Sequence, residues 1–241
     1  MLATDFVKLS DRDFGSRSVV VTDAGVAILL YGRVQSLIGV ITLKRTLTGT
    51  EHVHSMARDL RWIALFVGVI WVVFFVDRVL PLENFGLIPR SVKGLIGIVT
   101  LPFLHADWGH ITSNSVPLIV LLLLLAGSRA NSIDIVVFIS VVAGFGLWLF
   151  GREAIHIGAS VLVFGLVGFL VCAGFFEKRL LSALIAIGVA VVYGSTLMYG
   201  VLPTQSGVSW EGHLIGALTG GLIAYYIAGD LTRGTGDGTR V

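Results

Sequence analysis

Charge is scarce in this chain of 241 residues. Only 13% of the residues are charged, whereas a soluble domain carries roughly a quarter. Hydrophobic residues make up 55%, and the mean hydropathy is +0.91. These values predict a protein embedded in lipid. The net charge of +2 and the absence of a basic stripe with interleaved aromatic residues exclude a nucleic-acid-binding surface.

Cysteine is almost absent as well. The single cysteine, Cys172, lies inside an apolar run, so the chain cannot form an internal disulfide and cannot build a cysteine-rich metal site. We interpret Cys172 as a small core or lipid-facing residue. The first 17 residues are polar and charged, and the apolar run at 24–31 lacks a convincing cleavage site, so no secretory signal is predicted.

Long apolar runs, by contrast, are frequent. A helix that spans a bilayer needs about 20 mostly apolar residues. Six stretches meet this requirement, and they run over 62–80, 109–127, 133–150, 157–176, 180–200 and 212–228. We therefore expect an all-α, polytopic membrane protein whose core is a bundle of six transmembrane helices.

The distribution of lysine and arginine predicts the orientation of this bundle. Basic residues concentrate before the first span, in the loops 128–131 and 177–179, and in the C-terminal tail. Because cytoplasmic loops carry the excess of basic residues, both termini are predicted to be cytoplasmic. The long loop 77–108 and the loop before Gly158 then face outward. We expect a multi-pass protein of the bacterial plasma membrane.

Three regions follow from this parse. Residues 1–60 are expected to form an N-terminal cytoplasmic segment of unknown structure, and residues 61–229 the six-helix membrane domain. The C-terminal tail, 230–241, is rich in glycine and is predicted to be disordered.

Polar residues inside the spans are the candidates for function, because such groups are expensive in a membrane. The first cluster contains His105, His110 and Asn114 at the start of the second span. His110 and Asn114 are four residues apart and share a helix face, and both can donate hydrogen bonds. The gap between the histidines does not match a helical zinc motif, so no metal and no cofactor are predicted. These histidines could also simply satisfy loop and helix-end backbone groups.

The second cluster, His156, Gly158 and Ser160, opens the fourth span. A serine at this position is often only a helix cap. However, the free N–H groups of a helix N-terminus also favour a developing negative charge. The soluble esterase elbow Gly-x-Ser-x-Gly is excluded, because residue 162 is leucine.

The third cluster, in the sixth span, consists of Gly212, His213, Gly216 and Gly220. Glycines four residues apart allow two helix backbones to approach closely, and His213 lies within one turn of Gly216. The alternative interpretation is a packing groove with one satisfied histidine. Six polar groups from the three clusters could line an outward-open wet cavity: His105, His110, Asn114, His156, Ser160 and His213.

Taken together, the ordered clusters resemble the rhomboid family of intramembrane serine proteases over about residues 60–229. That family has His-x4-His-x3-Asn in the second helix, Gly-x-Ser at the start of the fourth and a glycine-flanked histidine in the sixth. The resemblance implies a serine endopeptidase that cuts peptide bonds in or near transmembrane helices of membrane-protein substrates.

The resemblance also implies roles for individual residues. Ser160 would be the nucleophile and His213 its general base. His110, Asn114 and the backbone N–H of Ser160 would form the oxyanion hole. The remaining residues expected to line the site are His105, Gly158 and Phe164.

Two features depart from the family pattern. Val161 stands where relatives usually have glycine after the serine, and this β-branched residue could alter the oxyanion pocket or the cleft. The loop 77–108 lacks the Trp-Arg pair of many relatives. Two alternatives follow: a catalytically impaired relative that binds membrane-protein clients, and a small transporter or channel, although no paired half-helix pattern occurs. The sequence does not predict an oligomeric state.

Overall fold

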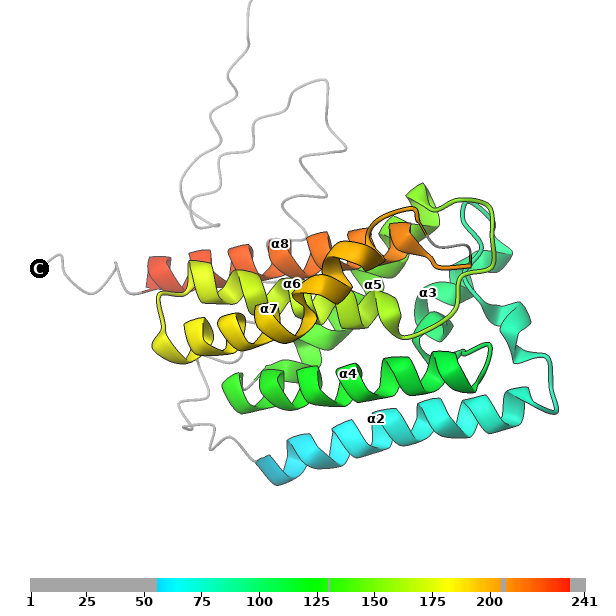
Figure 1. The fold of residues 1–241 in the computed structure, drawn as a ribbon, viewed down its shortest axis with the longest axis horizontal. Helices are drawn as coiled ribbons and strands as arrows, with labels where there is room; N and C mark the ends of the chain where they lie inside the picture. The colour runs from blue at the N-terminus through cyan, green and yellow to red at the C-terminus, as the bar shows by residue number, and fades with distance from the viewer. Residues whose placement is uncertain (1–55, 130, 205–206, 235–241) are drawn as a thin grey trace, which may run out of the picture. The chain divides into compact units, whose positions relative to one another are not determined.

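A computed structural model describes residues 56–129, 131–204 and 207–234 (Figure 1). A long helix lies at each of the six predicted segments. Four of these helices, α2, α4, α5 and α7, are long and apolar enough to cross a membrane, whereas α6 is apolar but has 17 residues. The helices are α2 (Met56–Asp77), α4 (Trp108–Ser128), α5 (Ser132–Phe150), α6 (Ser160–Phe176), α7 (Leu180–Gly200) and α8 (Trp210–Gly234).

The expected region boundaries at residues 61 and 229 both fall inside helices, because α2 begins at Met56 and α8 continues to Gly234. The expectations for residues 1–55 and 235–241 lie outside the described residues.

Helix α6 is the centre of the membrane domain. It packs against α4, α5, α7 and α8 (Figure 1), and 11 of its 17 residues are buried. A helix that is apolar on all sides lies either in lipid or inside a protein core, and the burial of α6 places it in the core. The main core therefore forms around α6, where Leu166 and Phe169 pack with Phe74 of α2, Leu121 of α4 and Ile139 of α5.

Glycines bring the backbones of α6 and α8 together. A Cβ atom on Gly168 would collide with the carbonyl of Ala217, and one on Gly220 would collide with the carbonyl of Gly165. The close approach predicted from the glycine spacing in α8 is therefore confirmed. The two helices that carry Ser160 and His213 thus have a fixed separation along their packed length.

The loop between α2 and α4 is folded and anchored to the end of α5. The guanidinium of Arg90 donates to the carbonyl of Gly151 at 2.7 Å, and the indole N–H of Trp148 donates to the carbonyl of Ser91 at 2.9 Å. A cation at a helix C-terminus is also favoured by the helix dipole. These contacts stabilise the loop between α2 and α4, which lacks the Trp-Arg pair of many relatives. Its short helices are η1 (Leu82–Phe85), η2 (Lys93–Ile96), α3 (Gly97–Thr100) and η3 (Leu101–Phe103).

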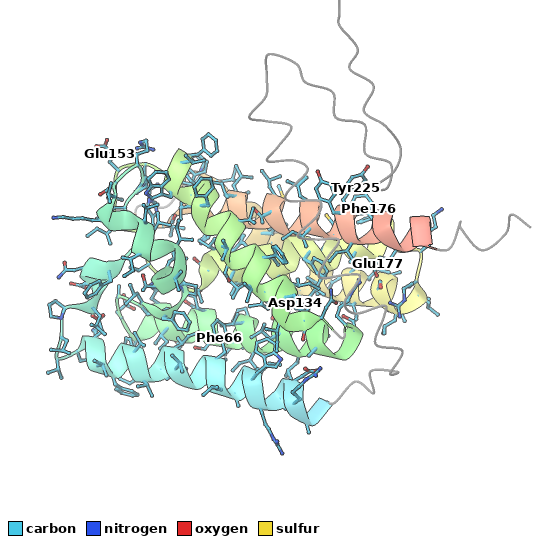
Figure 2. The ribbon with its side chains drawn as sticks, turned by 180° about the vertical axis from the view of Figure 1, so that it is seen from behind. Phe66, Asp134, Glu153, Phe176, Glu177 and Tyr225 are labelled. Carbon is cyan, nitrogen blue, oxygen red and sulfur yellow. The ribbon has the colours of Figure 1, made fainter. Side chains whose placement is uncertain are left out.

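A buried polar cluster lies at the end of the bundle opposite to this loop. Figure 2 shows Glu177, at the end of α6, far from Glu153, in the loop between α5 and α6. Arg129 forms an ion pair with Glu177, and both side chains are almost fully buried. The Ser182 hydroxyl donates to the second carboxylate oxygen of Glu177 at 2.7 Å. The Arg129 guanidinium also lies 5.4 Å from the ring centre of Phe169. We refer to Arg129, Glu177 and Ser182 as the far-end cluster.

Candidate active site

A cavity of about 1130 Å³ lies among α4, α6, α7 and α8. Each of the three polar clusters contributes to its wall. His110 and Asn114 come from α4, Ser160 from α6 and His213 from α8. The fold therefore brings residues that are up to about one hundred positions apart in sequence to one cavity.

Ser160 is the first residue of α6, and the turn before it requires glycine. Gly158 has a φ of +115°, and a Cβ atom there would lie 2.5 Å from Nε2 of His110. Its N–H donates to the carbonyl of Leu101 at 2.9 Å. Both the left-handed backbone and the lack of space exclude a side chain at position 158. Among the described residues, the Ser160 hydroxyl has no hydrogen-bond partner, and the N–H groups of a first helical turn have none within the helix.

His213 is held in a defined orientation in the first turn of α8. Its Nδ1 lies 2.9 Å from the carbonyl oxygen of Gly200, and the ring stacks on Phe164 with centroids 4.0 Å apart and planes 5° apart. A carbonyl can only accept, so Nδ1 carries the hydrogen. The lone pair of the neutral imidazole is then on Nε2. Nε2 of His213 makes no hydrogen bond within the described part of the chain.

His110 and Asn114 lie one turn apart on α4. The Asp107 carboxylate caps this helix by accepting from the His110 N–H at 2.8 Å. The amide nitrogen of Asn114 donates to the His110 carbonyl at 2.8 Å. Because a side-chain amide has two N–H groups, one donor of Asn114 is still available to the cavity.

His105 and Gly158 are not part of the cavity wall, contrary to the prediction. His105 is fully buried behind the wall, where its Nε2 accepts from the Ala159 N–H at 3.3 Å and its ring lies edge-on to His110. Burial and the neighbouring His110 lower the pKa of His105 to about 4, against a smaller opposing effect of the Phe103 backbone. The His105 side chain thus accepts a hydrogen bond from the backbone of the turn that precedes Ser160.

His156 does lie on the cavity wall, and both ring nitrogens are engaged. Nε2 donates to the carbonyl of Arg152 at 3.1 Å, so Nδ1 accepts from the Ser209 hydroxyl at 2.7 Å. Burial lowers the pKa of His156, although the Arg152 carbonyl and the Glu211 charge oppose this shift. Arg152 also pairs with Glu211. The sequence alone does not predict the pair of Arg152 and Glu211, because no spacing pattern relates residues that are 59 positions apart.

The Val161 side chain is not part of the cavity wall. It is buried in a second hydrophobic cluster with Leu87, Leu101 and Leu147, and it faces Gly212 of α8. Successive residues of a helix point in different directions. Ser160 therefore faces the cavity while its neighbour faces the core.

Comparison with known proteins agrees with this arrangement. A family model described as the Rhomboid domain matches residues 93–230. An uncharacterized protein of Mycobacterium tuberculosis is 36% identical over 179 residues, which cover 69% of this chain and 74% of that protein. An uncharacterized protein of Mycobacterium leprae is 33% identical over 207 residues, which cover 78% and 81%. The chain is an integral membrane protein and belongs to the rhomboid family, whose members are generally intramembrane serine proteases.

Proposed function

We propose that this protein is an intramembrane serine endopeptidase that cuts membrane-protein substrates in or near their transmembrane helices, with Ser160 and His213 as its catalytic dyad. One observation carries the proposal. The imidazole of His213 shares a cavity wall with Ser160 and is tied through Nδ1 to the Gly200 carbonyl. This contact leaves Nε2 as the basic nitrogen, as a general base requires.

The proposed reaction begins when the Ser160 hydroxyl attacks the carbonyl carbon of the scissile peptide bond. Nε2 of His213 takes the hydroxyl proton and then transfers it to the leaving amine. A water molecule, deprotonated by the same nitrogen, hydrolyses the acyl-enzyme. The Gly200 carbonyl fixes the tautomer, a role that a carboxylate has in three-residue sites. The face of Phe164 stabilises the imidazolium that forms in each step.

Three donors can stabilise the negative oxygen of the tetrahedral intermediate. They are the His110 ring, the second amide N–H of Asn114 and the backbone N–H of Ser160. Preorganised donors in a site with little water are worth more than the same donors in solution. The three groups come from α4 and from the N-terminus of α6, so they would converge on the oxygen from two sides.

The cavity extends from this site between α4 and α7, where Pro117 and Tyr193 belong to its wall. Pro117 has no N–H, so the carbonyl of Ser113 lacks its helical partner. This leaves a polar backbone group next to the cavity, which suits water and a partly unwound peptide. We propose that a substrate helix enters sideways here and unwinds, so cleavage should favour residues that weaken helices.

The proposed topology follows from the distribution of charge. All six long helices span the bilayer of a bacterial plasma membrane, including α6 and α8. Both termini are cytoplasmic, with a separate segment before α2 and a tail after α8. The far-end cluster then lies near the cytoplasm, and the serine turn lies near the outer surface.

The test compares wild type, Ser160→Ala and His213→Ala in labelling by a fluorophosphonate probe and in cleavage of a single-span reporter protein in liposomes. We expect both variants to lose activity by about 10⁴-fold or more, because the two side chains act as one unit. Cleavage that persists in Ser160→Ala would refute the proposal. Failure of wild type to label would favour a catalytically impaired relative that binds clients, although Val161, the main argument for that alternative, faces away from the cavity.

A further inference from the structure

Four side chains join the two segments that lead into the proposed dyad. Arg152 and His156 precede Ser160 in the loop between α5 and α6, while Ser209 and Glu211 precede His213 at the start of α8. We call Arg152, His156, Ser209 and Glu211 the clasp. Its members are on or beside the cavity wall, but none has a role in the chemistry proposed above.

The first connection of the clasp is an ion pair with an additional hydrogen bond. Nη1 of Arg152 lies 3.1 and 3.3 Å from the two carboxylate oxygens of Glu211, and its Nη2 donates to the carbonyl of Val208 at 2.6 Å. Glu211 is 8% exposed, and a carboxylate at this depth needs a partner. One guanidinium thus binds both Val208, in the loop between α7 and α8, and Glu211, in the first turn of α8.

The second connection passes through His156. Its Nδ1 accepts from the Ser209 hydroxyl at 2.7 Å, and the carbonyl of Ser209 in turn accepts the backbone N–H of His213 at 3.1 Å. The backbone of His156 is itself paired with Leu87 through two hydrogen bonds of 2.8 and 2.9 Å. The position of the His213 backbone is therefore linked, through Ser209 and His156, to Leu87 in the folded loop between α2 and α4.

These connections supplement the helix packing near the dyad. A Cβ atom on Gly216 would collide with the carbonyl of Val161, and the Val161 side chain faces Gly212, so the glycine packing of α6 and α8 reaches the first turns of both helices. The clasp adds directed polar contacts to the segments that precede these turns. The Ser160 hydroxyl and Nε2 of His213 do not hydrogen-bond to each other anywhere in the described structure, so they do not hold each other. Their alignment therefore depends on the glycine packing together with the segments that lead into the two helices.

We infer that the clasp is a positioning device that sets the separation and alignment of Ser160 and His213. This inference rests on the proposed function. A misplacement of about 1 Å at a reacting centre can cost on the order of 10²-fold in rate. Loss of the clasp should therefore slow the reaction of Ser160 without removing any group that touches the substrate.

The experiment measures inactivation of the full chain by a fluorophosphonate, separating the maximal rate from the half-saturating concentration. In Arg152→Gln and Glu211→Ala we expect the maximal rate to fall about 10- to 100-fold, with the half-saturating concentration within about threefold of wild type. Arg152→Lys keeps the charge and can still pair with Glu211, although one nitrogen replaces the two that Arg152 uses, so it should recover part of the rate. The double variant Arg152→Gln/Glu211→Ala should be no slower than the slower single variant, because the two residues act as a unit.

Glu177→Gln is the matched control, since it breaks an ion pair at the opposite end of the helices. It should lower the melting temperature and leave the maximal rate of the folded protein unchanged. The inference is overturned if Arg152→Gln reacts within threefold of wild type, if the lysine variant is as slow as the glutamine variant, or if Glu177→Gln slows the reaction as much. A wild type that does not react overturns the proposed function instead, whereas these outcomes with a reactive wild type overturn the clasp alone.

Discussion

The far-end cluster and the proposed dyad differ in how their polar groups are paired. In the far-end cluster, Arg129, Glu177 and Ser182 satisfy one another, and Phe169 covers the guanidinium. At the cavity, Ser160 and Nε2 of His213 have no partner within the described residues. The polar groups of the far-end cluster are therefore paired with one another, whereas the two groups of the proposed dyad are available to bind a substrate.

This difference separates a structural polar cluster from a candidate site. Most buried polar groups in folded proteins are paired, so a wall with several unused donors and acceptors needs an explanation. Such groups reduce stability, and sites that bind or react commonly accept that reduction. Substitutions at the far end should therefore change stability more than reactivity, and substitutions at the cavity should do the reverse.

The largest expected effect on stability comes from Glu177→Gln. It leaves the buried Arg129 charge without its counter-ion, which should lower the free energy of unfolding by about 3–5 kcal/mol. Denaturant unfolding in detergent micelles measures this change. Replacing Arg129 and Glu177 together by methionine should restore part of the loss, since an apolar pair leaves no charge unpaired. Equal stability of Glu177→Gln and wild type would contradict the comparison.

The next effect is on reactivity and should occur at α4. His110→Ala and Asn114→Ala each remove one proposed donor to the oxyanion, so reporter cleavage should slow by about 10²–10³-fold. Thr112→Ala is a suitable control, because Thr112 lies between these residues but is exposed and bonds only to its own helix. If Asn114→Ala lowers the melting temperature as much as Glu177→Gln does, the two ends do not differ in the way described.

The sequence predicts the helices, because apolar length is a local signal, whereas the meeting of the three clusters is implied only by the resemblance to the rhomboid family. It does not predict the direction of every side chain. The predicted fourth span starts at residue 157, whereas α6 begins at Ser160, because Gly158 adopts a φ of +115° and ends the extended loop. Hydropathy cannot detect such a turn.

Polar contacts between distant loops are the other part that sequence reasoning could not supply. Glu211 lies in the first turn of α8, where the helix dipole favours an acidic residue. Its partner, Arg152, belongs to a loop between two other helices, and His105 turns inward to bind the Ala159 N–H. Each contact depends on how three loops fold over one end of the bundle, which no periodicity encodes.

A smaller effect concerns pH and the buried residues behind the cavity. The pKa of His105 is about 4 in the folded protein and 6.5 as a reference. Between these pH values His105 is protonated in the unfolded chain and neutral in the folded chain. The free energy of unfolding is therefore not reduced by His105 above about pH 6.5, and it should fall by about 3 kcal/mol as the pH drops to 4. Thermal unfolding across this range should show the loss in wild type.

His105→Gln tests the source of this pH dependence, since the glutamine oxygen can still accept from the Ala159 N–H but does not titrate. The loss of stability between pH 6.5 and 4 should be smaller in this variant, though part of it should remain because the pKa of His156 is lowered too. An unchanged pH dependence would show that His105 is not the group responsible.

The smallest effect on the reaction rate should come from substitution of Phe164, a packing residue that contacts His213. Its ring stacks on His213, and a Cβ atom at Gly200 would contact the same ring, so Phe164 presses the imidazole toward the carbonyl that fixes its tautomer. A stacked pair is worth about 0.5–1.5 kcal/mol, which corresponds to about a 2- to 10-fold slower reaction in Phe164→Leu. If the leucine variant reacts as fast as wild type, the Gly200 carbonyl alone is sufficient to hold His213.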